Sequence, residues 1–146
     1  MAFEAHVPEI SGVIQLAVAP VFLLTAIGTV VAALNIRLGR AVDRRRDLEE
    51  KLPSMPETEL QSAREELGII ARRIRFVYLA IQFAVISGLF VCLLIAGAFL
   101  GAFVRADLSY TIGGLFVFAM LALIACLLLF LREIFLAVST HRHVPR

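Results

Sequence analysis

Charged residues are scarce in this sequence and are absent altogether from three long stretches. Only 18% of the 146 residues are Asp, Glu, Lys or Arg, whereas 60% are hydrophobic. A soluble domain of this length needs far more polar surface to cover its core. This composition excludes soluble globular and disordered proteins, and two cysteines are too few for a disulfide framework.

Catalytic signatures are lacking as well. The sequence contains no Walker or GxGxxG phosphate loop, no GxSxG nucleophile elbow and no HExxH motif. His6, His141 and His143 lie in the tails, and Cys92 and Cys126 lie in apolar stretches without CxxC spacing, where packing explains them. We therefore expect that the protein is not an enzyme and that it has no catalytic residue, no metal site and no cofactor. The net charge of +2 likewise predicts no nucleic-acid partner.

The dominant features that are present are three uncharged apolar stretches, residues 10–36, 76–104 and 108–131. They contain 27, 29 and 24 residues, and each exceeds the roughly 20 residues that a helix needs to cross a bilayer. Backbone groups in lipid must be hydrogen-bonded within the protein, and none of the stretches alternates like a barrel strand. The sequence therefore predicts an all-α integral membrane protein with three transmembrane helices in a single membrane domain, residues 1–146.

The basic residues are distributed unevenly around these stretches. Thirteen of the fourteen lie either in residues 37–75 or in the tail from Arg132 onward, and only Arg105 lies on the other side. By the positive-inside rule, we expect a multi-pass protein of the inner (plasma) membrane with residues 37–75 and the C-terminus in the cytoplasm and the N-terminus outside. No Lys or Arg precedes the first apolar stretch, so we expect no cleaved signal peptide.

The segment between the first two stretches, residues 37–75, is predicted to be helical rather than a flexible loop. It is rich in Arg, Glu, Leu and Ala, and Pro53 and Pro56 separate its two halves. The apolar residues of its second half are three and four positions apart, as in a coiled coil: Leu60, Ala63, Leu67, Ile70 and Ile74. We expect the first two transmembrane helices to extend into a cytoplasmic antiparallel helical hairpin, which could bind a protein partner.

Two groups of charged residues are expected at the membrane boundary. Glu133 follows the third apolar stretch, and its expected partners on other helices are Arg37, Arg40 and Arg72. A structural ion pair is one hypothesis for Glu133, and a proton or cation site is the other. The basic residues beside the bilayer are expected to bind anionic lipid headgroups: Arg44, Arg45, Arg46, Arg73 and Arg75.

Polar and small residues form stripes along the predicted membrane helices. On the first helix they suggest a polar path with the acidic Glu9 at its outer mouth: Glu9, Ser11, Gln15, Thr25 and Thr29. On the second helix small residues recur at every fourth position: Ala80, Ala84, Gly88, Cys92 and Ala96. Small and polar residues in membrane helices favour helix–helix contacts. For the polar stripe of the first helix, the alternative to such a contact is an aqueous path.

Three segments resemble a family of small bacterial membrane proteins, the domain of unknown function 2721. They are IQLAVAPVFLLT at residues 14–25, NIRLGRAVDRRRDLE at residues 35–49 and FLREIFLA at residues 130–137. The resemblance implies a bacterial multi-helix membrane protein and supplies no activity or catalytic residue. Two functional hypotheses remain. One is a homo-oligomer that forms a cation-favouring pore, and the other is a structural or adaptor subunit whose hairpin binds a partner.

Overall fold

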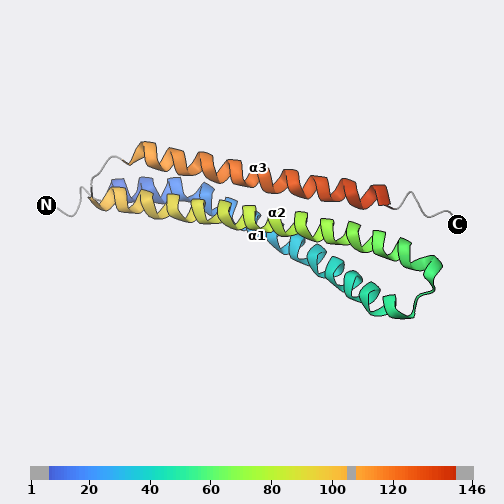
Figure 1. The fold of residues 1–146 in the computed structure, drawn as a ribbon. Coiled ribbons are helices and arrows are strands. Elements are labelled where there is room, and N and C mark those ends of the chain that lie inside the picture. The colour runs from blue at the N-terminus through green and yellow to red at the C-terminus, as the bar shows by residue number, and fades with distance from the viewer. Residues whose placement is uncertain (1–6, 105–107, 141–146) are drawn as a thin grey trace. The chain divides into compact units, whose positions relative to one another are not determined.

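The computed structural model describes residues 7–104 and 108–140, all of whose regular elements are helices (Figure 1). The elements are α1 (Val7–Lys51), the short 3-10 helix η1 (Leu52–Ser54), α2 (Glu57–Val104) and α3 (Ser109–Thr140). The long helices contain 18-residue windows with mean hydropathy of 2.3, 2.6 and 3.0. All three are therefore long and apolar enough to cross a membrane, as predicted.

The helices α1 and α2 each continue from an apolar stretch into the charged segment between them. No proline interrupts residues 31–51 or 57–82, so backbone hydrogen bonding continues beyond the apolar residues. The chain reverses at η1, where the Met55 amide donates to the Leu52 carbonyl at 3.3 Å. The Pro56 carbonyl then accepts from the Glu59 amide at 2.9 Å, which starts α2. The two prolines thus mark the turn at the position expected from the sequence.

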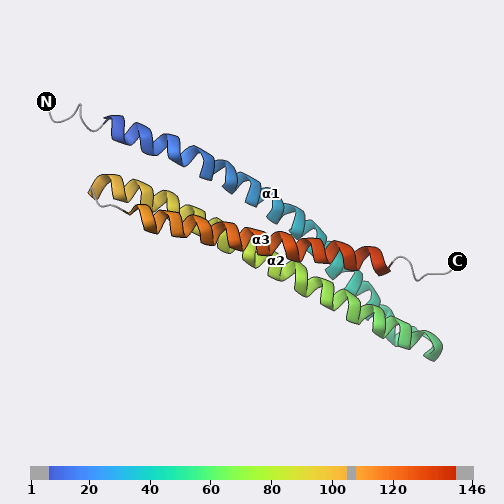
Figure 2. The ribbon, with the colours of Figure 1, turned by 90° about the horizontal axis from the view of Figure 1, so that it is seen from above.

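The chain divides into two compact units, and each combines parts of all three helices. The first unit comprises the residues up to Val30 together with Phe83–Ile124. Within it, α2 and α3 lie side by side (Figures 1 and 2), and the Ser87 hydroxyl donates to the Ala119 carbonyl at 2.8 Å. The Phe90 and Phe118 rings stack with their centroids 5.9 Å apart. A buried hydroxyl bonded across two helices indicates close backbone approach at this point.

The buried face of α2 differs from the predicted ladder of small residues. Ala80 and Ala84 are fully buried, but Cys92 and Ala96 are exposed. The buried positions are instead three and four residues apart: Val77, Ala80, Ala84, Ser87, Val91 and Leu94. A residue at every fourth position advances about 40° around a helix with 3.6 residues per turn, so the ladder rotates out of the contact. A spacing that alternates between three and four residues stays close to one face.

The second unit comprises Val31–Gln82 together with the chain from Ala125 onward, and it contains the helical hairpin. The end of α1 packs against the start of α2 around the buried side chains of Leu48, Ala63 and Ile70. Partly buried side chains complete this hydrophobic cluster: Leu52, Met55, Leu67 and Ile74. Four of the apolar residues that the sequence predicts to be spaced as in a coiled coil therefore belong to the cluster: Ala63, Leu67, Ile70 and Ile74.

Much of the apolar surface of the three helices faces outward. Within the most apolar window of each helix, only 17%, 22% and 17% of the residues are buried. Leu89, Phe103 and Leu128 are examples, with 58%, 71% and 60% of their surface exposed. An exposed apolar surface of this extent is suited to lipid rather than to water.

Candidate functional site

The most distinctive site of the second unit is a carboxylate that joins its three helical segments. Glu133 on α3 is 1% exposed. Its Oε2 accepts from Arg37 on α1 and its Oε1 from Arg73 on α2, each at 2.9 Å. The side chains of Arg37 and Arg73 are 41% and 32% exposed, so each arginine retains contact with the surroundings of the protein.

The sequence explains why these three side chains meet at one level. Arg37 directly follows the first uncharged stretch, Arg73 lies three residues before the second, and Glu133 lies two residues after the third. Charged residues at the same end of neighbouring apolar segments are thus brought to one depth. Because charges at such a boundary are costly without partners, pairing of one carboxylate with two guanidinium groups stabilises all three.

Two aromatic rings lie close to arginines at the level of the ion-pair cluster, which consists of Glu133, Arg37 and Arg73. The Arg37 guanidinium lies over the Phe130 ring, with its carbon 5.0 Å from the ring centroid. Phe130 is one helical turn before Glu133, so α3 presents a ring and a carboxylate to the same arginine. Arg132 points elsewhere and lies over the Phe76 ring at 5.6 Å. Both contacts have the geometry of cation–π interactions.

The partners of Glu133 in the structure differ from those predicted from the sequence. Arg37 is predicted and contacts Glu133, but Arg40 and Arg72 form no ion pair with any described residue. Arg73, which the sequence assigns to lipid headgroups, takes the second carboxylate oxygen instead. Arg72 and Arg73 point about 100° apart around α2, so only a knowledge of the packed face distinguishes them.

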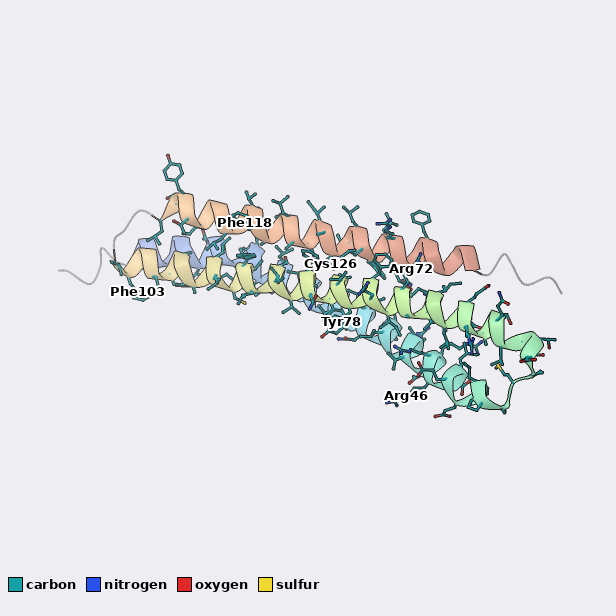
Figure 3. The ribbon with its side chains drawn as sticks, viewed as in Figure 1. Arg46, Arg72, Tyr78, Phe103, Phe118 and Cys126 are labelled. Carbon is teal, nitrogen blue, oxygen red and sulfur yellow. The ribbon has the colours of Figure 1, made fainter. Side chains whose placement is uncertain are left out.

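The other residues assigned to lipid headgroups also divide into two groups. Arg44 donates through Nε and Nη2 to Glu66 on α2, at 3.0 and 2.8 Å, and Arg45 pairs with Glu49 one turn away. Arg46 and Arg75 are exposed and form no ion pair within the described chain. Figure 3 shows Arg46 on the side of α1 remote from α2. Arg46 and Arg75 therefore remain available to external anions.

The structure describes the side chains of three of the five residues of the polar stripe, and these lie on the exposed face of α1. Gln15, Thr25 and Thr29 are all exposed, whereas the side chains of Glu9 and Ser11 lie outside the described part of the structure. The Thr25 hydroxyl donates to the Val21 carbonyl at 3.4 Å, and that of Thr29 to the Thr25 carbonyl at 3.0 Å. Each hydroxyl is satisfied within its own helix, so neither requires water or a neighbouring helix.

A family profile described as "Protein of unknown function (DUF2721)" matches residues 17–143. The chain belongs to this family. No curated protein and no solved structure matches the chain. The matched residues include α3 with Glu133 and the parts of α1 and α2 that carry Arg37 and Arg73, so the ion-pair cluster lies within the family region.

The site holds one carboxylate between two guanidinium groups. Two guanidinium groups are hydrogen-bond donors only, and the single carboxylate accepts from both. Among the residues whose side chains the structure describes, no three His, Cys, Asp or Glu gather closely enough to hold a metal ion. His6, His141 and His143 lie outside the described residues. The arrangement can fix the positions of three helical segments relative to one another within the second unit.

Proposed function

We propose that the chain is a multi-pass protein of the inner membrane that serves as a scaffold for a protein partner. In this proposal, residues 37–75 and the C-terminus lie in the cytoplasm, and the N-terminus lies outside. The strong asymmetry of basic residues supports this orientation. The role is one of binding rather than catalysis, and the helical hairpin is the binding element.

The observation that carries the proposal is the construction of the hairpin as a packed element. It has its own hydrophobic cluster around Leu48, Ala63 and Ile70, and the Arg44–Glu66 ion pair joins its two helices. Glu133 ties it to α3. A charged segment that only connected two membrane helices would need none of these contacts. A packed helical pair presents a fixed pattern of side chains, which a partner helix can recognise.

Site-specific photo-crosslinking in cells tests the scaffold. A crosslinking amino acid placed at the exposed hairpin residues Gln61 or Ile69 is expected to give one discrete adduct with a cytoplasmic protein. The same amino acid at Leu89, on the apolar surface of α2, is the control and is expected to give no such adduct. The absence of any adduct from the hairpin, or an adduct with an extracytoplasmic protein, would contradict the proposal.

A homo-oligomeric, cation-favouring pore is a second candidate, because the exposed polar residues of α1 present a face on which several copies could meet. Cysteine substitution at Thr29 separates the two functions, after Cys92 and Cys126 have been replaced by alanine. The scaffold predicts no reaction with hydrophilic thiol reagents and no cation flux in liposomes. The pore predicts both reaction and flux, and Val18→Cys, on the same exposed face, would then react as well.

A further inference from the structure

A pocket of about 480 Å³ opens within the second unit, between α1 and α2. Four arginines contribute to its lining: Arg37, Arg40, Arg44 and Arg73. Among the described residues, two carboxylates pair with them: Glu133 binds Arg37 and Arg73, and Glu66 binds Arg44. Four positive and two negative charges leave an excess of two positive charges around the pocket. A concave site with this balance attracts anions.

The hydrogen-bond donors of the pocket are also incompletely used. The Nε of Arg73 is buried and has no hydrogen-bond partner among the described residues. Arg40 makes no side-chain hydrogen bond or ion pair with any residue that the structure describes. The guanidinium donors of Arg40 are therefore open to a ligand in the pocket. Planar guanidinium groups match the oxygens of a phosphate group particularly well.

The pocket lining also contains four apolar residues, and two of them precede the arginines on α1. Ala33 and Ile36 belong to the first uncharged stretch, and Ile36 is 58% exposed. Apolar residues therefore meet the arginines at the level where the uncharged stretch ends. A molecule with a phosphate group and an apolar chain is complementary to both kinds of residue, since the chain can continue along the apolar surface.

We propose that this pocket binds a phosphate ester group, carried by an anionic phospholipid or by a small soluble phosphate. The ester oxygens accept hydrogen bonds from Arg40, and the excess positive charge is neutralised. The phospholipid source rests on the membrane placement proposed above, whereas binding of a phosphate ester does not. Neither source depends on a protein partner of the hairpin or on ion conduction.

Binding to the purified, delipidated full-length protein tests this site. The probes are dioctanoyl phosphatidylglycerol, glycerol 3-phosphate and dioctanoylglycerol, which lacks phosphate, and the readouts are native mass spectrometry and the shift in melting temperature. We expect saturable binding of at least one phosphate-bearing probe and none of dioctanoylglycerol. Binding of phosphatidylglycerol alone identifies a lipid site, and equal binding of glycerol 3-phosphate identifies a soluble phosphate.

Arg40→Gln is the decisive variant, because Arg40 lines the pocket without taking part in an ion pair among the described residues. It is expected to weaken binding by about tenfold or more, through loss of a charged donor. Arg72→Gln is the matched control. Arg72 is exposed, lies outside the pocket lining and carries the same charge, so binding should change less than about twofold. Equal losses in the two variants, or no binding of either phosphate-bearing probe, would overturn the proposal.

Discussion

Glu133→Ala is expected to lower the free energy of unfolding by about 3 kcal/mol, because Glu133 is the one buried charged side chain among the described residues. The change leaves Arg37 and Arg73 close together without the carboxylate that accepts from both. Removing one partner of a buried ion pair typically costs about 3–5 kcal/mol, and the partial exposure of the arginines favours the lower end. Thermal and denaturant unfolding in mild detergent, followed by circular dichroism, measure the effect.

Two further variants show whether the loss arises from unpaired charge. Glu66→Ala also removes a carboxylate from an arginine, but both side chains of that pair are well exposed, so a loss below about 1 kcal/mol is expected. Replacing Glu133, Arg37 and Arg73 together by leucine or methionine should recover most of the stability. If the triple variant were as unstable as Glu133→Ala, the explanation by unpaired charge would be wrong.

Ala119→Leu is expected to destabilise the protein by about 2–3 kcal/mol through overpacking. Ala119 is 0% exposed, and its carbonyl accepts from Ser87 on α2 at 2.8 Å, so the two helices are close at this point. A larger side chain must either separate them, which breaks the hydrogen bond, or adopt a strained rotamer. The measurement is the melting temperature in detergent.

The control for this overpacking lies two residues earlier on the same helix. Val117 is 56% exposed, and Val117→Leu adds a methylene to the outward surface, where it should change the melting temperature little. Similar losses from Ala119→Leu and Val117→Leu would show that the buried face of α3 has been assigned incorrectly.

The sequence is most informative about features set by local composition. Uncharged stretches mark the three apolar helices, and Pro53 and Pro56 locate the turn before α2. The three-and-four spacing of Ala63, Leu67 and Ile70 predicts residues of the hairpin cluster. Each of these signals depends on neighbours along the chain, so no knowledge of tertiary contacts is needed to interpret it.

Features that depend on helix rotation are predicted less well. Glu133 is recognisable as a charge that requires a partner, yet the choice of Arg73 over Arg72 depends on which side of α2 faces α3. The Arg44–Glu66 pair joins residues 22 positions apart and has no local signature. The ladder of small residues predicts that Ala84 and Cys92 are both buried, but only Ala84 is. Residues repeated at every fourth position rotate gradually around the helix and so leave the packed face.

Double-mutant cycles in unfolding free energy test most directly the claim that Glu133 joins the three helical segments. The variants are Glu133→Ala, Arg37→Ala and Arg73→Ala, singly and in the two pairs that include Glu133. The ion-pair cluster predicts that each pair costs less than the sum of its single changes, with a coupling of about 1 kcal/mol or more. Additivity within about 0.5 kcal/mol in both cycles would contradict it, because residues that do not interact show no coupling.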